Sequence, residues 1–288
     1  MRILGTGLTG LVGSRITELL KDTFEFENIS LDTGVNITEK DSVLRAITSS
    51  TASIVVHLAA KADVDGCEKD KLLGKEGDAW KINVKGTQHV VDACRLGGKQ
   101  IIYISTDFVF DGEKEEYSEE DAPSPINWYA QTKYEGEKIV QGSDTPWLII
   151  RIAYPYRSSF ERKDFVRAVA SRLKNGQEVT MVKDHIMTPT FIDDIAKALH
   201  LLIEKNATGI FHVVGSQWVS PYDGALLIAK TYGFDTGLVQ ETTRAQYFTN
   251  RAPRPFRLAL KNDKLRRLGV PMLPFSEGLA SIKDSIVL

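Results

Sequence analysis

Strand-like and helix-like segments alternate along the first half of this 288-residue chain, and this rhythm limits the folds open to it. The expected strands are short apolar runs, and the expected helices separate them. We expect strands near residues 3–4, 28–31, 53–58, 100–105 and 147–152, and helices over residues 11–21, 39–49, 79–96 and 127–141. Apolar strands joined by helical crossovers run parallel and are covered on both faces. The sequence therefore predicts an α/β fold with an open, doubly wound, Rossmann-like parallel sheet.

Three glycines follow the first predicted strand in the run Gly7-Leu-Thr-Gly10-Leu-Val-Gly13, which opens the first predicted helix. Glycine lets the backbone turn tightly and approach a ligand, and a helix start offers free N–H groups and the positive end of its dipole. The loop predicts a dinucleotide whose pyrophosphate lies against it. A tight strand-to-helix turn that binds nothing is the alternative.

A carboxylate, Asp32, is expected at the end of the second strand, about 20 residues after the loop. It can accept hydrogen bonds from the adenosine ribose hydroxyls, and it repels a 2′-phosphate. No Arg or Lys directly follows it, so NAD(H) is favoured and NADP(H) is the second choice. The amide of Asn36, next to Ile37, is placed to meet the adenine edge. A simple turn role for Asp32 is compatible with this interpretation.

Tyr129 and Lys133 lie four residues apart on a predicted helix and therefore share one face. A neighbouring ammonium, together with a nicotinamide cation, favours the phenolate, so we expect the pKa of Tyr129 to fall from its usual value near 10. Such a tyrosine can exchange a proton with a carbonyl or carbinol oxygen while hydride moves. Thr106, directly after a buried strand, can hydrogen-bond the same oxygen. The alternatives are a solvated helix face for the pair and a turn-stabilising role for Ser105, Thr106 and Asp107.

With these residues in place, the sequence resembles an extended short-chain dehydrogenase/reductase, and most of all the dTDP-4-dehydrorhamnose reductase family. The resemblance spans nearly the whole chain. It is carried by the glycine loop, His57-Leu-Ala-Ala60, Asp63-Val-Asp65, Ile82-Asn83-Val84, Ser105-Thr-Asp-Phe-Val-Phe-Asp-Gly112, Pro125-Ile-Asn-Trp-Tyr-Ala-Gln-Thr-Lys133, Pro189-Thr190 and Arg254-Pro255.

The resemblance implies roles for individual residues. Tyr129 is then the proton donor, Lys133 binds the nicotinamide ribose, and Thr106 contacts the reacting oxygen. The implied cofactor site also includes Thr9, Leu11, Val12, Leu58, Ala59, Ala60, Lys61, Asn83 and Ser105, of which Leu11 and Val12 meet the pyrophosphate through backbone groups. The implied sugar site includes Asp107, Phe108 and Tyr154. Phe108 replaces the tyrosine usual in this family and Tyr154 its tryptophan, so the identity of the sugar stays open.

The function expected from the resemblance is NAD(P)H-dependent reduction of a nucleotide-linked 4-keto-6-deoxy sugar. A dehydratase is disfavoured because Phe108 stands where the glutamate of a Thr-Asp-Glu triplet would be. Two alternatives stay open. One is an NAD-dependent sugar-nucleotide epimerase, and the other is a non-catalytic regulatory subunit similar to that of methionine adenosyltransferase.

The pattern changes after Pro155. We expect residues 1–155 to form the dinucleotide-binding domain, to which later segments return, and residues 156–288 to form mainly a smaller substrate-binding region. Arg251 and Arg254 are candidates to bind a nucleotide diphosphate, with surface ion pairing as an equal alternative. His185 is a candidate substrate contact, although a buried structural histidine is the more common case.

The composition of the chain limits the classes of partner that it is expected to bind. A net charge of −2 argues against nucleic acid, and no apolar run has the length of a membrane span. Two cysteines, Cys67 and Cys94, predict neither a disulfide framework nor a cysteine-based zinc site, and no histidine pair has metal-ligand spacing. Without a signal-peptide pattern, a cytoplasmic location is expected. A nucleotide-sugar substrate and a second copy of the chain are the partners that the resemblance implies.

Overall fold

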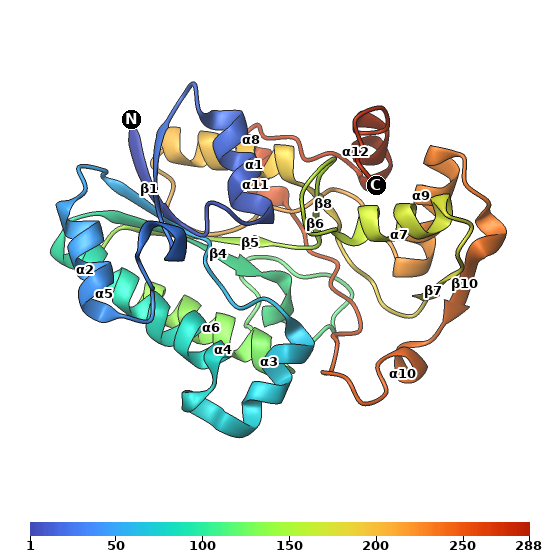
Figure 1. Ribbon diagram of the computed structural model, residues 1–288, viewed down its shortest axis with the longest axis horizontal. Coiled ribbons are helices and arrows are strands. Elements are labelled where there is room, and N and C mark those ends of the chain that lie inside the picture. Colours follow the sequence, from blue (N-terminus) through green and yellow to red (C-terminus); the bar gives the residue numbers. More distant parts are fainter.

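The computed structural model describes residues 1–288. Its centre is a six-stranded parallel sheet with strand order β2-β1-β3-β4-β5-β9 (Figure 1). The strands are β1 (Arg2–Thr6), β2 (Glu25–Ile29), β3 (Ile54–His57), β4 (Gln100–Thr106), β5 (Trp147–Ile152) and β9 (Gly209–His212). The chain moves from β1 to β2 on one side and then returns to β3 on the other side of β1. This reversal confirms the doubly wound fold and creates a crevice at the carboxyl ends of the strands.

The second strand begins and ends earlier than the sequence suggested. The expected span was residues 28–31, whereas β2 covers Glu25–Ile29. It is an edge strand that pairs only with β1, and only Ile29 of its five residues is buried. An edge strand of this kind carries charged residues such as Glu25 and Glu27, so the apolar run that marks a central strand is missing.

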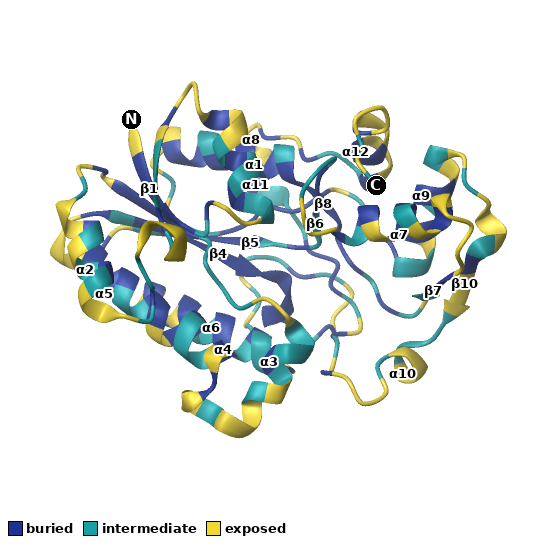
Figure 2. Ribbon diagram, viewed as in Figure 1, coloured by how far each residue is buried: buried dark blue, intermediate teal, exposed yellow.

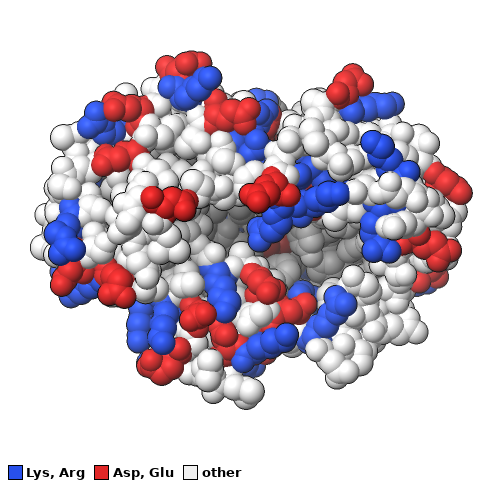
Figure 3. All heavy atoms as spheres, viewed as in Figure 1, with Lys and Arg blue, Asp and Glu red and all other residues white.

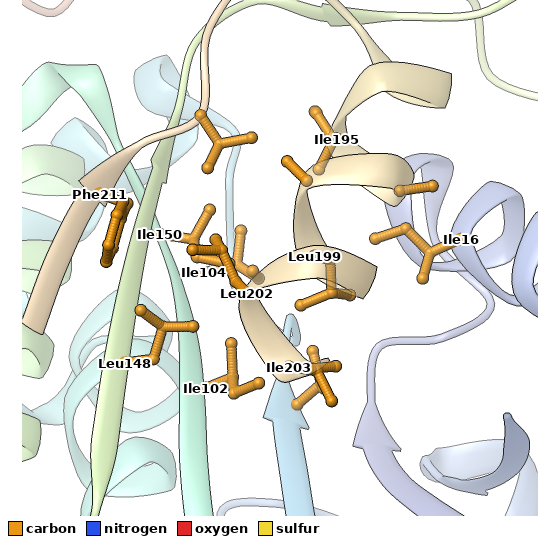
Figure 4. Close-up of a cluster of buried hydrophobic side chains, with 14 of the residues drawn as sticks. Ile16, Ile102, Ile104, Leu148, Ile150, Ile195, Leu199, Leu202, Ile203 and Phe211 are labelled. Carbon is orange, nitrogen blue, oxygen red and sulfur yellow. The ribbon is translucent and has the colours of Figure 1, made fainter. Parts of the chain in front are cut away.

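Helices cover both faces of the sheet. One face is covered by α1 (Leu11–Leu20), α8 (Ile192–Glu204) and α11 (Asp263–Arg267), and the other by α2 (Lys40–Ser49), α5 (Thr87–Leu96) and α6 (Trp128–Gln141). In Figure 4 the side chain of Leu199 and the helix α8 lie between Ile16 of α1 and Ile150 of β5, within one buried apolar cluster. Because apolar side chains are buried on both faces, the sheet is held rigidly, and the carboxyl ends of its strands are fixed in position.

The helix expected over residues 79–96 is not uniform. It consists of α4 (Asp78–Trp80), a π-helical turn over Lys81–Gly86, and α5. The wider turn contains Asn83, whose buried side chain holds the segment that follows β3. π-Helical turns are rare and occur frequently at functional sites. A second segment that the sequence did not reveal, α3 (Val64–Asp70), lies between β3 and this turn.

A smaller region packs beside the sheet and has an apolar core of its own (Figure 2). It contains α7 (Phe165–Lys174), α9 (Pro221–Tyr232), α10 (Arg244–Tyr247), α12 (Phe275–Ser281), and the strand pairs β6 (Pro155–Tyr156) with β8 (Thr190–Phe191) and β7 (Val179–Val182) with β10 (Val239–Thr242). The segments α8, β9 and α11 belong to the second half of the chain but return to the sheet. No helix combines the length and apolar character required to cross a membrane.

Candidate active site

The glycine loop packs more closely than any other residue type would allow. Gly7 has a φ of +70°, and a Cβ built there would lie 2.7 Å from the backbone nitrogen of Ala59. A Cβ on Gly13 would lie 2.5 Å from the carbonyl oxygen of Gly7. The N-cap of α1 is Gly10, so no side chain occupies the free N–H groups at the start of this helix. The loop can therefore receive an anionic group on its backbone amides.

A cavity of about 600 Å³ opens at this loop, between the sheet and the smaller region. In the space-filling view the molecule is hollowed between its two halves, with charged side chains around the hollow (Figure 3). Most of the predicted site residues line the cavity: Gly7, Gly10, Leu11, Val12, Gly13, Leu58, Ala60, Ser105, Thr106, Asp107, Phe108, Tyr129, Lys133 and Tyr154. Arg254 also lines it, together with Arg162, Lys163 and Asp164, which the sequence did not single out.

Other predicted residues lie outside the cavity wall. Thr9 is exposed in the glycine loop, and Ile37 is buried against the π-helical turn. Asn36 accepts a hydrogen bond from the backbone of Thr38, which follows it. Asp32 was expected at a strand end, but it lies exposed in a short turn, Leu31–Thr33, because β2 already ends at Ile29.

Hydrogen bonds from residues outside the cavity wall hold the segment that follows β3. The side chain of Asn83 accepts a hydrogen bond from the backbone N–H of Lys61 at 2.8 Å and donates to its carbonyl at 3.0 Å. The Lys61 ammonium bonds Asp70 at 2.7 Å, while the N–H of Ala59 donates to Thr6 Oγ1. Asn83 and Ala59 thus support the cavity wall next to the glycine loop without lining it.

Helix α6 brings the predicted catalytic pair to the cavity. It begins after Asn127, whose side chain accepts a hydrogen bond from the N–H of Ala130. Lys133 is 3% exposed; its ammonium donates to the carbonyl of Ile104 at 2.8 Å and lies 4.0 Å from the centre of the Tyr103 ring. Burial lowers the pKa of Lys133 to about 7, and Glu137 opposes this shift. A solvated-face role for Lys133 is therefore wrong.

The pKa of Tyr129 moves in the direction opposite to our expectation. Burial raises it well above 10, and a hydrogen bond with Thr106 opposes the rise only in part. The expected lowering counted the charges of Lys133 and of a nicotinamide cation and left out the cost of burying a phenolate, and in the protein alone that cost prevails. The Tyr129 hydroxyl is consequently protonated near neutral pH, which is the form that a proton donor needs.

The turn after β4 (Asp107–Val109) places a hydroxyl and a carboxyl group beside Tyr129. Thr106 accepts a hydrogen bond from the N–H of Phe108 at 3.2 Å and donates to Asp107 Oδ1 at 3.0 Å, so it stabilises this turn as well as facing the cavity. Asp107 Oδ2 and Ser105 Oγ are buried without a partner. Burial raises the pKa of Asp107 to about 7.

A buried ion pair fixes α6 against the sheet. Arg151 of β5 binds both carboxylate oxygens of Glu137, at 2.9 and 2.7 Å, and both side chains are almost fully buried. Glu137 lies four residues after Lys133 and so anchors the next turn of the same helix face. No local sequence pattern predicts this pair, because its members lie on different elements. A charged residue inside the apolar run of β5 was the available signal.

Two segments of the smaller region complete the cavity mouth. Arg254 bonds Asp65 of α3 at 2.9 Å and donates to the carbonyl of Ala252 at 2.7 Å. Arg254 pairs with a carboxylate, as one of the two interpretations of the sequence predicted, and it also lines the cavity. The loop of residues 157–163 is tied to α1, where the Arg157 guanidinium donates to Ser14 Oγ at 2.9 Å and to Glu18 at 3.0 Å.

Comparison with known proteins finds relatives over nearly the whole chain. A family model described as the RmlD substrate binding domain matches residues 1–287. A protein from Aggregatibacter actinomycetemcomitans named dTDP-4-dehydrorhamnose reductase is 30% identical over 98% of both chains. The solved structure of a dTDP-4-dehydrorhamnose reductase from Bacillus anthracis in complex with NADP has a TM-score of 0.89, with 28% identity over 98% of both chains. Methionine adenosyltransferase 2 subunit beta from Mus musculus is 28% identical over 99% of this chain and 87% of its own length.

Proposed function

The chain belongs to the RmlD substrate binding domain family, and from that premise we propose that it reduces a nucleotide-linked 4-keto-6-deoxy sugar with NAD(P)H. One observation carries the proposal. Thr106, Tyr129 and Lys133 line a single cavity with the glycine loop. This places a protonated phenol and a partner hydroxyl next to a loop suited to a dinucleotide, which is what a carbonyl reductase requires.

The residues present fit a nicotinamide dinucleotide. The uncapped start of α1 and the close packing of Gly7 and Gly13 leave backbone amides for a pyrophosphate. Ser105 Oγ is buried without a partner in the cavity wall, as expected of a group that bonds a ligand. When bound, the dinucleotide supplies the hydride. Lys133 is placed to hold its nicotinamide ribose.

The protein's own residues then act on the sugar oxygen. As hydride reaches the keto carbon, the Tyr129 hydroxyl gives its proton to the carbonyl oxygen and an alcohol forms. Thr106 lies beside Tyr129, and its hydroxyl holds the same oxygen by turning its hydrogen from Asp107 Oδ1 to the substrate. Because burial keeps Tyr129 protonated, the donor is ready at neutral pH.

We also propose that residues 156–288 mainly hold the nucleotide sugar. Arg162, Lys163 and Arg254 lie in the cavity wall on segments of this region. Guanidinium and ammonium groups bind phosphate oxygens strongly, so these side chains suit a diphosphate. Its sugar would then extend toward Tyr129.

The direct test mixes the purified protein with NADH or NADPH and a dTDP-4-keto-6-deoxy sugar. Loss of the reduced nicotinamide absorbance, equal in amount to the alcohol formed, is the expected result. Tyr129→Phe should lower turnover at least a hundredfold and leave cofactor binding unchanged, because general acid catalysis contributes about that much. Tyr134→Phe, on the same helix, is the matched control and should keep full turnover.

Other outcomes point to the alternatives. Undiminished turnover in Tyr129→Phe contradicts the proposed proton donor. Tightly held NAD that never exchanges, with interconversion of sugar epimers, favours the epimerase. No oxidation with either cofactor, together with stoichiometric recovery of a methionine adenosyltransferase, favours a regulatory subunit, in line with the mouse relative.

A further inference from the structure

Tyr154 is held in a backbone conformation that its residue type rarely adopts. It directly follows Ala153 at the end of the β5 segment and has a φ of +39°. An aromatic residue in this region is strained, and such strain persists only where the surrounding structure enforces it. Its carbonyl accepts a hydrogen bond from the N–H of Thr190 at 3.2 Å, and its side chain lines the cavity. The fold thus tolerates backbone strain at Tyr154 in a position where this residue lines the cavity.

The ring of Tyr154 lies close to the catalytic group. The Phe108 ring is 6.4 Å from the Tyr154 ring and 6.1 Å from the Tyr129 ring, centre to centre. Both tyrosine rings therefore pack beside the Phe108 ring, and all three residues line one cavity. We accordingly expect a sugar whose carbonyl lies at Tyr129 to present its neighbouring ring carbons to Tyr154.

His185, a residue that the sequence left between a substrate contact and a structural role, fixes the direction of the Tyr154 hydroxyl. It is 1% exposed and absent from the cavity wall, so it does not contact substrate. Its Nδ1 lies 2.7 Å from the carbonyl oxygen of Pro255, which can only accept, so Nδ1 carries the hydrogen. Burial lowers the pKa of His185 to about 4, and Arg244 and Arg254 add to this effect. The ring is thus neutral, and its Nε2 is an acceptor.

It follows that the Tyr154 hydroxyl is a donor to His185. The Tyr154 oxygen lies 3.0 Å from Nε2, and its single hydrogen is used in that bond. Only lone pairs then remain on this oxygen, so any further hydrogen bond to it must be donated by the ligand. We propose that Tyr154 Oη accepts a hydrogen bond from a sugar hydroxyl on one of the two ring carbons nearest the reacting carbonyl along the hydroxylated side, and that His185 is the positioning residue that sets this polarity.

This inference rests on the proposed function and narrows its substrate. A sugar with a free hydroxyl at carbon 3 or carbon 2 satisfies Tyr154, whereas a sugar that is deoxygenated there leaves the oxygen unpaired. A site built to bond a hydroxyl discriminates against the analogue that lacks it. The substrate class is thus a nucleotide-linked 4-keto-6-deoxyhexose that keeps the critical hydroxyl.

The test compares wild type with Tyr154→Phe on three substrates: the full dTDP-4-keto-6-deoxy sugar and its 2-deoxy and 3-deoxy analogues. Wild type should prefer the full sugar over one of the analogues by roughly tenfold in kcat/KM, the effect of one neutral hydrogen bond. Tyr154→Phe should lose that preference, because its kcat/KM should fall for the full sugar and stay unchanged for that analogue. An equal fall on all three substrates, or no fall on any, overturns the inference.

A binding experiment separates this inference from the proposed reaction. Calorimetric titration with a dTDP-6-deoxyhexose needs no turnover, and Tyr154→Phe should weaken it about tenfold while dTDP alone binds unchanged. If wild type shows no turnover but the two proteins still differ in affinity for the dTDP-sugar, the proposed reduction is contradicted. The proposed hydrogen bond of Tyr154 is then still supported. Equal binding of the dTDP-sugar to wild type and variant overturns the hydrogen bond whatever the turnover.

His185→Leu tests the positioning role. Combined with Tyr154→Phe, it should cost nothing beyond the single variants, because both remove the same oriented hydroxyl. Melting and cofactor titration show whether His185→Leu is folded. If it is not, Tyr154→Phe decides the inference alone. Additive losses in folded variants would contradict the role of His185.

Discussion

At the scale of single residues, burial sets the charge states of the catalytic pair. It raises the pKa of Tyr129 and lowers that of Lys133 to about 7, although the two lie on one helix face. A fully buried ammonium is costly even with a carbonyl partner, because the interior replaces little of its hydration. Both groups therefore tend toward their neutral forms at neutral pH.

The stability of the protein should carry the signature of Lys133. The pKa of this group falls from 10.5 in the unfolded chain to about 7 in the fold, so between these pH values the unfolded chain binds more protons. The free energy of unfolding then rises with pH across this window, by up to about 1.4 kcal/mol per pH unit. In urea titrations from pH 7.5 to 9.5, the free energy of unfolding of wild type should rise relative to that of Lys133→Met. A difference that stays constant with pH would contradict the buried-ammonium interpretation.

Asp32 should influence the choice between the two cofactors. It lies exposed just beyond β2, and we propose that its carboxylate repels a 2′-phosphate. Asp32→Ala should shift the NADH/NADPH ratio of kcat/KM toward NADPH by roughly fivefold, since an exposed charge pair contributes about 1 kcal/mol. Asp41→Ala, an exposed change at the start of α2, should leave the ratio unchanged. An unchanged ratio in Asp32→Ala places Asp32 away from the ribose.

At the scale of elements, the site depends on how α6 is fixed to β5. The Glu137–Arg151 pair joins the two elements inside the core. Glu137→Ala should lower the free energy of unfolding by roughly 3–5 kcal/mol, because it leaves Arg151 as an uncompensated buried charge. The double variant Glu137→Leu with Arg151→Met should recover most of this loss. Urea denaturation measures both, and a double variant as unstable as the single would refute the argument.

At the scale of the whole molecule, local signals predicted the elements and long-range contacts decided the site. Apolar runs located β3, β4 and β5, and glycine spacing located the loop before α1. The edge strand β2 escaped because it carries charges, and the π-helical turn has no simple periodicity. The Tyr154–His185 and Glu137–Arg151 contacts join residues 31 and 14 positions apart, and no local pattern encodes them. The pKa of Tyr129 was misjudged for the same reason, since burial is a property of the assembled fold.

The two halves of the molecule meet where Arg157 reaches α1, and this contact should control ligand binding more than stability. Arg157 is 9% exposed and bonds Ser14 and Glu18. It fixes the loop that carries Arg162 and Lys163 into the cavity wall. Arg157→Ala removes the bonds that fix this loop, so ligand binding must then pay the entropic cost of ordering it. Fluorescence titration should therefore show that NADPH and the dTDP-sugar bind roughly threefold to tenfold more weakly. Arg172→Ala, whose side chain is exposed on α7, is the control and should bind both ligands as wild type does. Unchanged affinities in Arg157→Ala would mean that the loop keeps its position without α1, held by the bonds of Arg167 to the carbonyls of Phe160 and Arg162.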